Sequence, residues 1–149
     1  MAGAVAAIGF GAAVVWRAER GAEQPVQLRP DDAAVTALGQ RVYAAQCAAC
    51  HGAGLEGQPD WQIAGDNGVL PAPPHDETGH TWHHDDAMLT DYIRRGGQDV
   101  LDDMGVAMTS GMPSFGEILD DGDVAAILAF IKSRWPDRIR AVQAKRNGG

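Results

Sequence analysis

The sequence has few cysteines, few aromatic residues and few basic residues. Each of these shortages excludes or disfavours some classes of fold or function. Its 149 residues include 2 cysteines, 6% aromatics, and 12 Lys and Arg against 20 Asp and Glu. The formal net charge of -8 argues against nucleic acid as a partner, because a phosphate backbone is bound by a basic face. Few aromatics leave a lean core, which a large apolar cofactor inside the domain would stabilise.

The first sixteen residues contain no charged side chain. As a helix they would span about 24 Å, somewhat less than a hydrocarbon core of about 30 Å. We expect residues 1–16 to be a membrane anchor or a signal segment, and a soluble helix is a third alternative. No basic residue precedes the apolar run and no clean small-residue cleavage site follows it, which favours the anchor. Arg17 and Arg20 follow the run and oppose the positive-inside preference, which would be explained if Met1 were internal to a longer chain.

The distribution of charged residues and prolines divides residues 17–149 into three parts. Residues 17–30 contain two prolines and read as a linker, residues 31–136 as one folded domain, and residues 137–149 as a polar C-terminal tail. Three segments of the domain show helical spacing of apolar residues behind an aspartate that can cap the helix. These aspartates are Asp31 or Asp32 for the first helix, Asp85 for a short middle helix, and Asp120 or Asp121 for the last. No stretch alternates as a strand would, so the fold class is all-α.

Both cysteines lie in "QCAACHG", residues 46–52, with a histidine directly after the second. A redox dithiol, half of a zinc site and a covalent haem anchor could each use such a stretch. The dithiol is typical of a strand in a βαβ unit, which this sequence lacks, and the spacing matches no common zinc finger. C-x-x-C-H is the pattern of c-type haem attachment: Cys47 and Cys50 would add to the haem vinyl groups and His51 would bind the iron.

A second axial ligand is expected far downstream, on the opposite haem face. Met112 precedes Pro113, which stiffens the loop and could hold a thioether against iron. Met108, Met104 or a histidine are the alternatives, and Met112 could also be a core filler. Four histidines within residues 75–84 could form a second metal site, contact haem propionates or lie in solvent.

With these residues in place, the chain resembles the class I (monohaem) c-type cytochromes, in a membrane-anchored bacterial form. "GQRVYAAQCAACHG" resembles the family's first helix, in which a glycine and an aromatic residue precede the haem motif; Gly39 and Tyr43 match them. "MPSFG" resembles the Met-Pro loop, and "HTWHHDDAMLTDYI" the segment in which a tryptophan precedes a short helix.

The resemblance implies a cytochrome c fold, in which three to four main helices surround one covalent haem c, preceded here by an N-terminal hydrophobic helix. It implies that Gly39 lets the first helix cross the last closely, near Phe130. It gives Trp82 the role of donating its indole N–H to a haem propionate. It also implies that a proline carbonyl holds the axial imidazole, and Pro59, Pro71, Pro73 and Pro74 all compete for this role.

The function expected is one-electron transfer in the respiratory chain rather than enzyme catalysis, because His51 and Met112 would fill both axial positions of the iron. The resemblance implies a quinol–cytochrome c reductase and a terminal oxidase as partners, at the cell membrane, with the haem domain on the periplasmic side. The alternative function is a haem peroxidase or small-ligand sensor with a labile Met ligand. Asp99, Asp102 and Asp103 have no capping role and are expected to dock a basic partner beside the Met112 loop.

Overall fold

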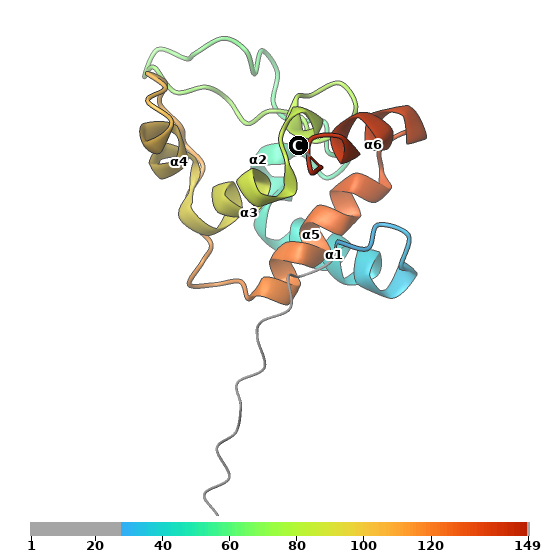
Figure 1. The fold of residues 1–149 in the computed structure, drawn as a ribbon. Coiled ribbons are helices and arrows are strands. Elements are labelled where there is room, and N and C mark those ends of the chain that lie inside the picture. Colours follow the sequence, from blue (N-terminus) through green and yellow to red (C-terminus); the bar gives the residue numbers. More distant parts are fainter. Residues whose placement is uncertain (1–27, 149) are drawn as a thin grey trace, which may run out of the picture.

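The structure is a computed structural model and describes residues 28–148. Over these residues the chain is helical, and the only β-pairing is an isolated bridge between Val69 and Thr109. The all-α prediction is therefore confirmed. The predicted hydrophobic segment 1–16 and most of the linker lie outside the described residues. The elements, drawn in Figure 1, are α1 (Ala33–Gln46), α2 (Ala48–His51), the 3₁₀ turn η1 (Thr81–His83), α3 (Asp86–Arg95), α4 (Gly97–Asp103), α5 (Asp121–Ser133) and α6 (Asp137–Ala144).

Helices α1 and α5 cross at the centre of the domain (Figure 1). Gly39 makes the close crossing possible, because a Cβ atom built on it would lie 1.8 Å from the backbone oxygen of Ala126 and 2.9 Å from the Cβ of Phe130. One turn further along α1, the Tyr43 ring packs on Phe130 with 5.5 Å between the ring centroids. The expected crossing of Gly39 near Phe130 is confirmed.

Helix α5 forms most of the core. From Val124 to Lys132 each of its residues is buried, so this helix is enclosed on all sides rather than on one face. Around it lie apolar side chains from the other helices and from the loops. They include Tyr43, Leu55, Leu89, Ile93, Leu119, Trp135 and Ile139.

Each of the three predicted helices begins at a capping aspartate. Asp32 accepts hydrogen bonds from the backbone N–H groups of Ala34 and Val35, at 3.0 and 3.2 Å. Asp85 caps α3 and Asp120 caps α5 in the same way. A side-chain oxygen at this position satisfies a backbone donor that the first helical turn leaves without a partner.

Two helices differ from the sequence expectation. Helix α4 begins directly after Gly96, whose φ of 86° breaks the chain direction between α3 and α4. Its seven residues are too few to show a helical period. Helix α6 occupies most of the segment expected to be a polar tail, and only Ile139 and Gln143 of it are buried. Polar contacts hold it, and apolar spacing could not reveal them.

The long segment 52–80 contains no helix or strand, yet hydrogen bonds, a ring stack and a β-bridge fix its course. Gln58 donates its backbone N–H to Ala72 at 2.9 Å, and its side chain accepts from the Ala72 N–H at 3.0 Å. The Trp61 ring stacks on His80, with centroids 5.4 Å apart. Between these contacts, Val69 pairs with Thr109 of the chain after α4 in the isolated bridge, where the two loops lie side by side (Figure 1). Within residues 28–148, no helix has the length and apolar character needed to span a membrane.

Candidate functional site

The CxxCH motif forms a single helical turn at the end of α1. The backbone N–H groups of Cys50 and His51 both bond to the carbonyl of Cys47, at 3.1 and 2.9 Å. The turn places both thiols within one helical turn, and neither is in a disulfide. Cys47 packs against the core, whereas Cys50 is exposed. Burial, and to a smaller extent the neighbouring Cys50, raise the pKa of the Cys47 thiol to about 11.

His51 is buried, and a backbone carbonyl fixes its ring. Its Nδ1 lies 2.9 Å from the carbonyl oxygen of Pro73. Because a carbonyl can only accept, Nδ1 must hold the proton and Nε2 keeps its lone pair. Burial lowers the pKa of His51, although the hydrogen bond to Pro73 opposes this shift. His51 is therefore a neutral imidazole with Nε2 free to bind a metal, as an axial ligand requires.

The structure selects Pro73 among the four prolines that the sequence left open. Pro73 reaches His51 because the 52–80 segment folds back toward the CxxCH turn. Gly57 donates to the His51 carbonyl at 2.8 Å, and the paired contacts of Gln58 with Ala72 bring the next residue, Pro73, beside the ring. Four prolines follow the motif within 23 residues, and no sequence signal distinguishes this one.

A second imidazole lies on the face of the first. The ring of His75 stacks on that of His51, with centroids 4.0 Å apart and an interplanar angle of 21°. Burial lowers the pKa of His75 well below its ordinary value, and the neighbouring His51 and His80 act in the same direction. His75 is therefore neutral at physiological pH. In the sequence His75 is one of four clustered histidines, and no spacing signal indicates this contact.

Met112 lies in a loop whose backbone is held on both sides. Its carbonyl accepts the N–H of Gly97 at 3.0 Å, and its own N–H donates to the Ser110 hydroxyl at 3.2 Å. A Cβ atom on Gly97 would lie 2.0 Å from the Ser110 Oγ and 2.8 Å from the Ser110 Cβ, so any side chain here would displace Ser110. Gln98 accepts the N–H of Ser110 at 3.0 Å and thereby ties the loop to α4. The Met112 side chain is half-buried against the same core as Cys47.

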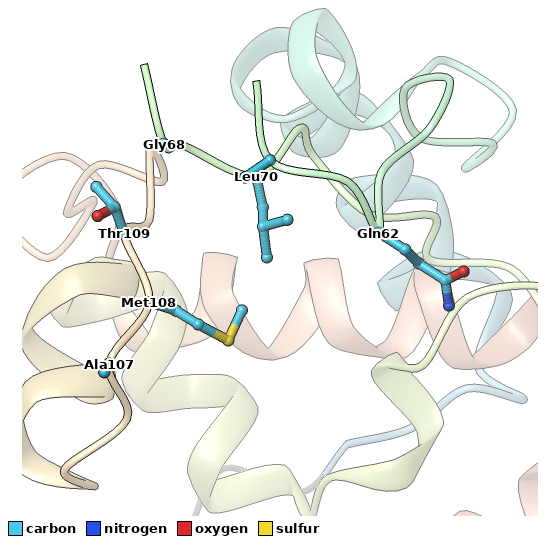
Figure 2. Close-up of a pocket in the computed structure, with 7 residues that line it drawn as sticks. Gln62, Gly68, Leu70, Ala107, Met108 and Thr109 are labelled. Carbon is cyan, nitrogen blue, oxygen red and sulfur yellow. The ribbon is translucent and has the colours of Figure 1, made fainter. Parts of the chain in front are cut away.

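Met108 has a different environment. It is 46% exposed and points into an open pocket of about 370 Å³ (Figure 2). Leu70 points into the pocket from the opposite side. The residues that line the pocket come from the 52–80 segment and from the chain after α4: Gln62, Ala64, Gly68, Leu70, Ala107, Met108 and Thr109. The third methionine, Met104, is 48% exposed.

Trp82 packs against the core, and its indole Nε1 is buried without a hydrogen-bond partner in the described part of the chain. A buried donor without a partner is costly, and a bound acceptor such as a haem propionate would remove that cost. The ring stacks on His83, with centroids 3.7 Å apart. Across residues 28–148, no three His, Cys, Asp or Glu side chains are placed to hold a metal ion, so the histidine cluster forms no such site there.

The aspartates of α4 are more engaged than the sequence indicated. Asp103 pairs with Arg95, and Asp102 accepts a hydrogen bond from Gln98 at 2.7 Å. Asp99 forms no ion pair with any residue in the described range. The α4 surface remains acidic, but one of its three carboxylates is paired with a basic side chain.

These residues fit haem c. Two free thiols lie within one turn, a neutral imidazole has Nε2 free, and a buried indole N–H awaits an acceptor. Neither the comparison with curated proteins nor that with solved structures gave a match. A family model described as Cytochrome c matches residues 36–135, from within α1 to just after α5. This match spans most of the chain, which therefore belongs to the cytochrome c family, whose proteins bind haem c and transfer electrons.

Proposed function

We propose that the protein is a one-electron carrier with a single haem c, attached through Cys47 and Cys50 and ligated by His51 and Met112. The observation that supports this most strongly is the 2.9 Å contact from His51 Nδ1 to the Pro73 carbonyl. It fixes the tautomer and the ring direction of the residue that follows the second cysteine. A histidine held in this way is suited to metal binding rather than to acid–base chemistry.

Met112 is a better second ligand than Met108. Its side chain packs on the core that Cys47 and Trp82 also contact, and hydrogen bonds hold its backbone through Gly97 and Ser110. An ordered thioether loses little conformational freedom on binding iron, whereas the exposed Met108 would have to be ordered first.

The chemistry follows from the two ligands. Haem iron supplies a one-electron couple, and with both axial positions filled its charge changes with little rearrangement. The thioether of Met112 favours the ferrous state, and burial of His51 acts in the same direction by excluding water. No axial position is left for oxygen or peroxide, which separates this function from a peroxidase or ligand sensor.

The carrier acts in the respiratory chain, passing electrons between a quinol–cytochrome c reductase and a terminal oxidase on the periplasmic side of the cell membrane. Two features support this place. Covalent attachment through CxxCH takes place outside the cytoplasm in bacteria, and residues 1–16 are an uncharged apolar run of the kind an anchor needs, although its helical span of about 24 Å is shorter than a hydrocarbon core of about 30 Å. Tethering raises the effective concentration of the carrier near its partners without any new contact.

The ligand assignment is tested by two substitutions in the haem-loaded protein. Met112→His should keep a six-coordinate iron and lower the midpoint potential by roughly 0.1–0.3 V, because imidazole stabilises ferric iron better than a thioether. Met108→Leu should leave the potential and the ferric Met–iron charge-transfer band unchanged. Loss of that band in the Met108 variant alone would show that Met108 is the ligand. Absence of the band in the wild type at neutral pH would favour the peroxidase or sensor.

Partners and location need a separate experiment. Membranes containing the full chain are solubilised in mild detergent, and the complexes that purify with it are identified. Recovery with a quinol-oxidising complex or an oxidase is the expected result. Stoichiometric retention in one complex at high salt would instead mean a fixed subunit, and recovery in the soluble fraction would contradict the anchor.

A further inference from the structure

The ring of His75 lies against the ring of His51, at a centroid distance of 4.0 Å and an angle of 21°. We propose that His75 is a positioning residue, which sets the plane of the axial imidazole by stacking on its face. This inference rests on the proposed role of His51 as an iron ligand. It adds a residue that acts through His51 and does not itself touch the iron.

The backbone of His75 is anchored on two sides. Its N–H donates to the carbonyl of Leu55 at 2.8 Å, and its carbonyl accepts the indole N–H of Trp135 at 2.7 Å. Both partners are almost fully buried, at 1% and 3% exposure. His75 is thus attached to the loop that follows the motif and to Trp135, which follows α5 and lies 60 residues further along the chain. An anchor of this kind keeps the ring in place when the loops around it move.

The side chain of His75 is also fixed. Its Nδ1 lies 2.8 Å from the Thr81 hydroxyl, and that hydroxyl lies 3.4 Å from the Pro74 carbonyl. Because the carbonyl can only accept, the hydroxyl donates to it and accepts from the Nδ1–H of His75. The edge of the Tyr43 ring approaches from another side, with centroids 6.1 Å apart. One rotamer and one tautomer of His75 satisfy all of these contacts.

A hydrogen bond and a stack restrict different motions of His51. The bond from Nδ1 to Pro73 fixes the direction of the N–H, but the ring can still rock about that line. A flat ring 4.0 Å away blocks rocking toward that face. Residues Pro73, Pro74 and His75 therefore act as one unit: one carbonyl aims the imidazole, the next orients Thr81, and the third residue limits the tilt of the ring plane.

Three substitutions of His75 in the haem-loaded full chain separate stacking from simple support. His75→Phe keeps a flat ring and loses the Thr81 bond. His75→Leu keeps a similar volume without a flat face, and His75→Ala removes the stack. The readouts are the ferric electron paramagnetic resonance spectrum, whose anisotropy depends on the orientation of the axial imidazole plane, the midpoint potential and the thermal midpoint of unfolding. Ile139→Ala, in the core contact of α6, is the control for lost stability alone.

In the His75→Leu and His75→Ala variants, the low-field signal of the ferric electron paramagnetic resonance spectrum should broaden and shift, and the midpoint potential should decrease. The His75→Phe variant should keep the wild-type signal although it is less stable. The control should lose stability with an unchanged spectrum. If the alanine variant does not fold, the comparison of phenylalanine with leucine decides. A wild-type spectrum and potential in the leucine variant, or a phenylalanine variant that changes as leucine does, would overturn the proposal. Failure of the proposed function is distinct, because wild type would then show no histidine-ligated low-spin signal.

Discussion

At the scale of single residues, the positions that matter most are those where the backbone approaches a neighbour too closely for any other side chain. Gly39 allows α1 to lie on α5, and Gly97 allows the Met112 loop to lie on α4. The first contact sets the orientation of the helix that ends at Cys47. The second contact holds the loop that carries Met112. Both glycines thus position segments that carry the proposed haem ligands.

Gly39→Ala tests the crossing. The new methyl would lie 1.8 Å from the Ala126 oxygen, so the helices must separate. We expect a loss of about 2–4 kcal/mol in the free energy of unfolding, even though alanine is favoured over glycine within a helix by about 1 kcal/mol. Denaturant unfolding of the haem-loaded protein measures it. Gly148→Ala, where nothing lies within 4 Å, is the matched control. An unchanged midpoint for Gly39→Ala would contradict the tight crossing.

At the scale of helices, one carboxylate joins three of them. Asp86, in the first turn of α3, accepts from the Lys132 Nζ of α5 at 2.8 and 2.9 Å and from the Gln143 Nε2 of α6 at 2.7 Å. Asn147 adds a contact at 3.0 Å. Gln143 has no exposed surface, and the Lys132 side chain is 11% exposed. This network explains why α6, which is mostly polar, packs against the rest of the domain.

Asp86→Ala should therefore destabilise the fold by about 2–3 kcal/mol, because it leaves a nearly buried ammonium without its acceptor and a buried amide with only the His84 carbonyl, at 3.2 Å. Glu77→Ala is the comparison, since it breaks an exposed pair with Arg138 and should cost at most about 1 kcal/mol. Equal losses in the two variants, measured by denaturant unfolding, would show that the buried network contributes no more than a surface pair.

His84, which follows η1 and lies beside Tyr92 of α3, should also make stability depend on pH. Burial lowers the pKa of His84, and His80 and His83 add to the shift. A folded-state pKa below the ordinary 6.5 means that the unfolded chain takes up the proton first as pH falls. Stability is then fully present above pH 6.5 and decreases as pH falls from there toward the folded pKa, at up to about 1.4 kcal/mol per pH unit for one group.

His84→Asn should flatten this dependence. Urea unfolding of the haem-loaded wild type and variant between pH 5 and pH 8 measures the two slopes. The variant is expected to lose less stability on acidification. A slope identical to that of the wild type would mean that other groups cause the acid sensitivity.

At the scale of the whole molecule, charge is distributed unevenly along the chain. Between Arg41 and Lys132 the only basic residues are Arg94 and Arg95, and each is paired with an aspartate. The site lies in this acidic stretch. The C-terminal residues have the opposite balance, with one aspartate against Lys132, Arg134, Arg138, Arg140, Lys145 and Arg146. A partner that receives electrons near α4 is therefore expected to present basic residues around an apolar contact.

Conversion of Asp99, Asp102 and Asp103 to Asn should lower the second-order rate of electron transfer to a solubilised partner at low ionic strength. The difference should disappear at high salt, because charge steers the encounter and salt screens it over about 10 Å at 0.1 M. Stopped-flow kinetics measures the rate. A charge-matched control changes Asp31, Glu77 and Asp137, which pair with arginines of the C-terminal region. A rate that increases in the α4 variant would mean that the partner is acidic at that face.

Several features were predictable from the sequence because they depend on local chemistry. The capping aspartates and the α1 and α5 patterns predicted the helices, since a helix start and an apolar face are properties of neighbouring residues. Cys47, Cys50 and His51 marked the site in the same way, as three residues within one helical turn. The close approach of Gly39 to Phe130 followed from the resemblance, and the structure confirmed it.

The rest depends on residues that are distant in sequence. Pro73 reaches His51 because the loop between them turns back through Gln58, and the His75 ring is placed by Trp135 and Thr81. Helix α6 is held by a carboxylate 57 residues earlier in the chain. Such contacts involve ordinary residue types at no regular spacing, so no local pattern indicates them. Sequence determined which chemistry the site can perform, and only the tertiary structure decided which side chains hold its ligands in place.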